Sequence, residues 1–124
     1  MKRDMHLVRQ LLLYYEAKPD DRPEECPKIE VYSDIEVRYH LLLMHEANLL
    51  RCEPTKSTTS DRVIKVLPFS LTWEGHDFLD ASRDTQLWKR ALEIVGSKVG
   101  STSFGVLKVL LADLARKQLG IGAT

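Results

Sequence analysis

The sequence predicts a mainly α-helical protein with one small β-hairpin, an α+β class with a winged-helix-like core and additional C-terminal helices. Apolar residues recur at helical spacing along five segments, and two short β-branched segments joined by a polar turn follow the second of them. A recognition helix followed by a hairpin is the order found in winged helices. We expect a single domain over 1–124, with a winged-helix-like part over 1–72 and a C-terminal helical part over 73–124.

The first helix is expected over residues 3–17, where apolar side chains recur at helical spacing, namely Met5, Val8, Leu12 and Tyr15. Asp4 complements the positive end of the helix dipole, and Pro19 stops the helix. The following segment carries three prolines and many charges, so we expect a solvated surface loop. Within it, Lys28–Tyr32 could form one short strand.

The second helix is expected over 34–47, with Ser33 or Asp34 as its N-cap because either side chain accepts bonds from free amides. Its core face is formed by apolar residues at helical spacing, with His40 at the margin: Val37, Leu41 and Met44. Asn48 stands where a helix ends on a left-handed residue.

The hairpin is expected to pair a strand at 49–53 with a return strand at 62–71. Pro54–Asp61 consists of residues typical of turns. Pro68 is expected to break the return strand, because proline cannot donate to a strand ladder.

Three helices are expected after the hairpin. Thr72 caps the first of them, over 73–83, with Trp73, Phe78 and Leu79 as apolar anchors and Gly75 allowing close packing. The next includes 87–95 and ends in a turn at 96–102, and the last runs over 104–119 between Ser103 as cap and Gly120.

Formal net charge is zero, yet the charges are unevenly spread along the chain. Eight acids lie between residues 16 and 36 against three bases, whereas bases prevail from residue 85 onward. DNA-binding proteins usually show a basic surplus because affinity comes largely from neutralised phosphates. A dipolar chain could equally pair with a charged protein or with itself.

Candidate DNA-contacting residues lie on the second helix and on the hairpin turn: Arg38, His45, Lys56, Ser57, Thr58 and Arg62. Arginine can donate two bonds to a guanine edge, and the polar turn suits phosphates. Glu36, Leu42 and Glu46 share the outward face of the helix, and an acidic loop occupies the place of the usual bracing helix. An ordinary solvated hairpin is therefore the competing interpretation.

No motif of catalysis, metal binding or cofactor binding occurs, so we expect a protein that is not an enzyme and has no cofactor or metal. His40 and His45 point apart on a helix, and Glu74, His76, Asp77 and Asp80 fit the wet side of the third helix. Cys26 and Cys52 are expected to be free thiols. The N-terminus does not resemble a signal peptide and no apolar run is long enough for a membrane span, so a cytoplasmic location is expected.

The last helix is apolar on more than one face. Its additional apolar residues are candidates for a dimer or partner interface: Val106, Val109 and Leu110. The alternative is that this helix is central to the fold.

Three segments resemble a known family, domain of unknown function 2513, which comprises short bacterial and phage proteins: Met1–Arg9, Tyr39–Leu41 with His45–Ala47, and above all Leu71–Asp80, which contains Leu-Thr-Trp-Glu-Gly-His. The resemblance spans almost the whole chain and implies a bacterial or phage origin and a winged-helix-like core. It implies no activity and no catalytic residues. Asn48 stands where the resemblance leads us to expect glycine.

The sequence thus favours a non-enzymatic, winged-helix-like binding protein, with DNA-linked regulation as the first hypothesis because the fold most often serves it. The second hypothesis is a protein–protein interaction module, such as a phage-encoded modulator of a host factor.

Overall fold

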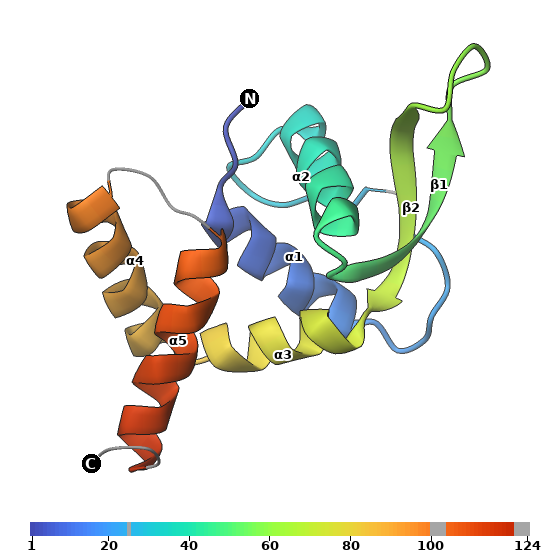
Figure 1. Ribbon diagram of the computed structural model, residues 1–124. Helices are drawn as coiled ribbons and strands as arrows, with labels where there is room; N and C mark the ends of the chain where they lie inside the picture. The colour runs from blue at the N-terminus through green and yellow to red at the C-terminus, as the bar shows by residue number, and fades with distance from the viewer. Residues whose placement is uncertain (25, 100–103, 121–124) are drawn as a thin grey trace. The chain divides into compact units, whose positions relative to one another are not determined.

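The computed structural model describes residues 1–24, 26–99 and 104–120, and its contacts divide the chain into two compact units, 1–76 and 77–124. The described elements are α1 (Met5–Ala17), α2 (Asp34–Glu46), β1 (Leu50–Lys56), β2 (Val63–Leu71), α3 (Trp73–Ser82), α4 (Thr85–Val99) and α5 (Phe104–Leu119) (Figure 1). The predicted class, mainly α with a small β-hairpin, is confirmed. The expected single domain divided after residue 72 stays a prediction.

Helix α1 begins at Met5 because Asp4 serves as its N-cap. The Asp4 Oδ1 atom accepts hydrogen bonds from the backbone amides of His6 (2.9 Å) and Leu7 (3.3 Å). The buried side of the helix follows the predicted spacing and is widened by further leucines: Met5, Leu7, Val8, Leu11, Leu12 and Tyr15. The helix is confirmed, and its start lies two residues later than expected.

The strand suggested over Lys28–Tyr32 is wrong, because this segment forms a turn. The Tyr32 amide donates to the Ile29 carbonyl oxygen (3.2 Å), and Val31 adopts a left-handed φ of 76°. A β-branched residue rarely takes that conformation. The turn reverses the chain so that the Tyr32 hydroxyl reaches Asp4 Oδ2 (2.8 Å).

Hydrogen bonds connect Lys18 and Glu24, at the start of the loop, to α1 and β2. The Glu24 amide donates to the Pro68 carbonyl oxygen of β2 (2.9 Å), and the Tyr15 hydroxyl donates to the Glu24 carbonyl oxygen (2.8 Å). The Lys18 ammonium donates to the Phe69 carbonyl oxygen (3.0 Å). The loop therefore lies along β2 at Pro68.

Helix α2 begins with a capping box in which Ser33 is the N-cap. Ser33 Oγ accepts from the Glu36 amide (3.2 Å), while Glu36 Oε1 accepts from the Ser33 amide (3.1 Å). The predicted core residues are all buried: Val37, Leu41 and Met44. The prediction that His40 lies at the margin of this face is wrong. Its side chain is 1% exposed and is hydrogen-bonded at both ring nitrogens. Asn48 is left-handed, with φ of 59°, as predicted.

Strands β1 and β2 form an antiparallel hairpin whose register pairs Leu50 with Leu71 and Lys56 with Val63. Strand β1 continues to Lys56, so the turn is shorter than predicted. Pro68 does not break β2. It pairs with Cys52 beside a register irregularity at Arg51/Cys52. The ladder is interrupted there, so the strand tolerates a residue that has no backbone N–H to donate.

Thr72 joins the hairpin to the start of α3. Its hydroxyl donates to the Asn48 carbonyl oxygen (2.6 Å) and accepts from the Gly75 amide (3.0 Å), as a cap should. A Cβ at Gly75 would lie 2.1 Å from the Leu49 carbonyl oxygen, so the predicted close packing is confirmed. Trp73 is not an anchor, because it is 82% exposed.

In the second unit, Phe78 meets Trp88 of α4 edge to face, with ring centroids 6.2 Å apart, and lies 5.0 Å from the Phe104 ring of α5. Further buried apolar side chains are those of Leu79, Ala91, Val95, Leu107, Leu111 and Leu114. The turn expected from residue 96 is wrong, because α4 continues to Val99. The expected turn residues 100–102 and the cap Ser103 lie outside the described residues.

Candidate nucleic-acid interface

The outward face of α2 carries two of the predicted DNA-contacting residues. Arg38 is exposed and His45 is half-buried. They are seven residues apart, which is about two helical turns and about 10 Å along one side of the helix. Both can therefore face the same ligand.

Helix α2 and strand β2 share a shallow recess. Its lining consists of Arg38 and Leu41 from the helix and of Lys65 and Val66 from the strand. Lys65 is exposed and was missed in the sequence. The signal that could have found it is the strand pattern, because polar Lys65 precedes Val66, which is 4% exposed. This recess brings the cations of the helix and the hairpin together.

The hairpin tip is ordered by its own polar groups. The Ser57 amide donates to the Arg62 carbonyl oxygen (2.8 Å) and closes the turn. Ser57 Oγ accepts from the Thr59 amide (3.2 Å) and lies 3.1 Å from Thr59 Oγ1. Ser57 thus serves the turn itself, whereas Lys56, Thr58 and Arg62 are exposed at the tip.

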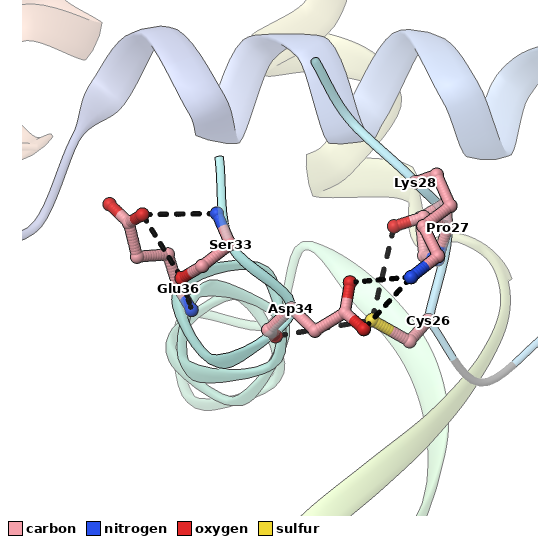
Figure 2. Close-up of polar contacts among 6 residues, drawn as sticks. All are labelled: Cys26, Pro27, Lys28, Ser33, Asp34 and Glu36. Atoms are coloured by element: carbon pink, nitrogen blue, oxygen red, sulfur yellow. Dashed lines mark hydrogen bonds and ion pairs between the residues drawn. The ribbon is translucent and has the colours of Figure 1, made fainter. Parts of the chain in front are cut away.

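Acidic side chains at the start of α2 are engaged locally, as Figure 2 shows. The Lys28 ammonium lies 3.0 Å from Asp34 Oδ2 and 3.1 Å from Oδ1, and Glu36 is held in the capping box by Ser33. Upstream, the Arg22 Nε atom lies 3.7 Å from Asp20 Oδ2. These contacts compensate part of the negative charge that the sequence places in this segment.

Glu24 in the loop accepts a hydrogen bond from the Tyr14 hydroxyl. This bond, with burial and the charge of Glu24, raises the pKa of Tyr14 to about 12. The Tyr32 hydroxyl is similarly perturbed: burial first, and then its bond to Asp4, raise its pKa to about 12. Both hydroxyls therefore remain protonated donors to a higher pH than an ordinary tyrosine does.

Neither thiol is in a disulfide, since Cys26 and Cys52 are both free, as expected. Burial raises the pKa of Cys52 to about 12, which makes it a poor nucleophile. Within residues 1–24, 26–99 and 104–120, no three side chains of His, Cys, Asp or Glu are grouped to hold a metal ion. The acid–histidine set noted on the third helix is exposed: Glu74, His76, Asp77 and Asp80.

The predicted interface residues lie on the outward side of α5. Val106 is 50% exposed, Val109 is 67% exposed and Leu110 is half-buried. Together with Gly105 and Asp113 they line a shallow, open hollow. Among the described residues of its own unit, this face of α5 is exposed, and the buried side of the helix is formed by Leu107, Leu111 and Leu114.

Over the described ranges, no helix is both long and apolar enough to span a membrane.

The chain is 29% identical over 120 residues to an uncharacterized protein of Haemophilus influenzae, covering 96% of this chain and 99% of that protein. No solved structure matches the present chain. The profile of a family described as hypothetical protein (DUF2513) matches residues 2–101. The chain therefore belongs to the DUF2513 family, as its resemblance predicted.

Proposed function

We propose that this chain is a non-enzymatic, winged-helix-like DNA-binding protein that contacts DNA through α2 and the β1–β2 hairpin. The observation that carries the proposal is the recess shared by Arg38 of α2 and Lys65 of β2. It places one cation of the helix and one cation of the hairpin strand on the same recess. A helix that reads a groove beside a hairpin that touches phosphate is the division of labour in winged helices.

The local charge of the hairpin favours DNA binding at this surface, although the whole chain has a formal net charge of zero. The hairpin, residues 50–71, carries Arg51, Lys56, Arg62 and Lys65 against Glu53 and Asp61. Lys56 and Arg62 flank the ordered tip, where phosphates can approach from solvent. Few phosphate contacts are available, so we expect weak binding, with a dissociation constant of about 10⁻⁴–10⁻⁶ M at physiological salt.

Part of the negative charge of the acidic loop and of the start of α2 is paired locally. Asp20 and Asp34 have cationic partners, and the Glu36 carboxylate accepts the Ser33 amide. A paired carboxylate repels phosphate less than a lone one because the pair presents little net charge. Arg38 is the arginine of α2, and it lines the recess that α2 shares with β2.

The test is fluorescence anisotropy with a labelled duplex of mixed sequence, titrated at several salt concentrations. The double variant Arg38→Ala/Lys65→Ala should weaken binding at least tenfold. It should lower the salt slope by about 0.9, since Lys65 is the member of the pair on the phosphate-contacting hairpin and each phosphate contact contributes about 0.9. The matched control, Lys89→Ala/Arg90→Ala, removes the same charge from exposed positions of α4. Equal losses in both variants, or no binding at low salt, would sink the proposal.

One observation favours a second candidate function, binding of a protein partner. Trp73 is 82% exposed at the first position of α3, and tryptophan is enriched among residues that dominate interface energetics. If Trp73 serves a partner, Trp73→Ala should abolish capture of that partner and leave DNA affinity intact. Arg38→Ala/Lys65→Ala should have the opposite effect.

A further inference from the structure

We propose that the chain forms a symmetric dimer in which α5 packs antiparallel against α5 of a second copy, about a two-fold axis near Val109. This inference requires none of the residues assigned to DNA. It concerns a helix that begins after the end of the family match at residue 101.

The face available for the contact is apolar and uncovered. Val109 is 67% exposed and Val106 is 50% exposed, on the side of α5 opposite to the buried Leu107 and Leu111. These valines form a shallow hollow together with Gly105, Leu110 and Asp113. Removing such a surface from water is favourable in proportion to the apolar area buried.

Gly105 provides room for a close approach. A Cβ built at this position meets no atom within 4 Å, so the described fold does not require glycine here. Gly105 is the second residue of α5 and lies in its first turn. A neighbouring helix packing onto Gly105 supplies a use for the missing side chain, as small residues do between closely packed helices.

Charge complementarity selects a second copy as the occupant, and the antiparallel direction. In an antiparallel pair centred on Val109, position 105 of one helix faces position 113 of the other. The Asp113 carboxylate of each copy then lies near the first turn of the opposite helix, where the dipole is positive. A parallel pair would place the two Asp113 carboxylates together and the two positive ends together. The line Gly105–Val109–Asp113 is therefore complementary to itself, as an isologous interface requires.

The expected contact is small. Helix α5 has 16 residues, and thus a length of about 24 Å. One helix from each copy buries less than the roughly 1,600 Å² of a standard stable interface. We therefore expect a dimer that dissociates on dilution, with a dissociation constant in the micromolar range.

The first test is sedimentation equilibrium of the full chain over a range of concentrations. Val109→Glu should raise the dimer dissociation constant at least tenfold, because it places two like charges at the axis. The matched control is Leu119→Glu, at a position that is 73% exposed but beyond the expected overlap. Gly105→Leu should also weaken the dimer while leaving the fold intact, since the position has free space within its own chain.

The second test asks whether position 109 lies at the two-fold axis. In a chain with Cys26→Ser and Cys52→Ser, Val109→Cys should form an intermolecular disulfide on mild oxidation, since a residue on a two-fold axis meets its own copy. Leu119→Cys should not. The proposal is overturned by a monomer at every concentration from about 1 μM to about 1 mM. It is also overturned if Val109→Glu unfolds the monomer, which would mean that the face is covered within its own chain, or if the dimer ignores both Val109→Glu and Gly105→Leu.

Discussion

The backbone amide of Asp4 donates a hydrogen bond to Nε2 of His40 across 2.8 Å. The other ring nitrogen, Nδ1, lies 2.8 Å from the Glu36 carbonyl oxygen. Because Nε2 accepts, Nδ1 must carry the proton and donate to that carbonyl. The ring, 1% exposed, thereby ties the start of α1 to α2 and is part of what positions the helix that presents Arg38.

We expect His40→Ala to lower the free energy of unfolding by about 1–3 kcal/mol, because it leaves the Asp4 amide without its partner. His45→Ala is the matched control, a change of the same residue type at a half-buried position of the same helix. Its cost should stay below about 1 kcal/mol, because the side chain is only half-buried. Urea denaturation of both variants measures the difference, and equal costs would contradict the assigned hydrogen bonds.

Gly75→Ala tests the close approach of α3 to residue 49. A Cβ at Gly75 would lie 2.1 Å from the Leu49 carbonyl oxygen, and backbone cannot swing aside as a side chain can. We expect a loss of stability of about 1–3 kcal/mol, typical of overpacking. Gly105→Ala is the control, since its Cβ meets nothing within 4 Å, and it should be neutral or slightly stabilising when measured at dilution. Equal changes in stability in both alanine variants would mean that α3 does not approach residue 49 this closely.

The capping box at α2 predicts coupled effects of two substitutions. Ser33→Ala should cost about 1 kcal/mol, because Ser33 Oγ holds the Glu36 amide. Glu36→Ala removes the reciprocal bond to the Ser33 amide. A double-mutant cycle of thermal or urea unfolding should show a nonzero interaction energy, since the two residues act as one unit. Simple additivity would mean that the box does not form in solution.

Stability should fall at alkaline pH through the tyrosines. The pKa of Tyr14 and that of Tyr32 are each raised from 10.0 to about 12. A raised pKa means that the folded state favours the protonated hydroxyl, so this contribution is complete below pH 10 and is lost between pH 10 and about 12. Unfolding measured at several values of pH should show this loss, and it should shrink in Tyr14→Phe and in Tyr32→Phe. If the alkaline loss of stability in Tyr14→Phe and in Tyr32→Phe is as large as in the unsubstituted chain, the assignment to these tyrosines is contradicted.

Local chemistry made several elements predictable from the sequence. The Ser33 cap, the left-handed Asn48 and the Thr72 cap depend on side chains that bond their own neighbouring backbone or on a local backbone preference. The helical spacing of Val37, Leu41 and Met44 gave the core side of α2 for the same reason, since it follows from the helix period alone.

Long-range contacts account for what the sequence did not reveal. His40 is buried because its partner amide comes from residue 4, and Lys65 joins the candidate site through packing of β2 beside α2. Trp73 could have been placed correctly. Gly75, Phe78, Leu79 and Ser82 share one buried side of α3, and the helix period puts Trp73 opposite to them.

An NMR titration of the isotope-labelled chain with a short duplex at low salt shows whether DNA contacts α2 and the hairpin. We predict that the backbone amides shifted by DNA cluster around Arg38, His45, Lys56–Arg62 and Lys65, and that the shifts reverse on addition of salt. Amides of α4 should remain unchanged. Shifts confined to other surfaces, or no shifts at all, would contradict the account.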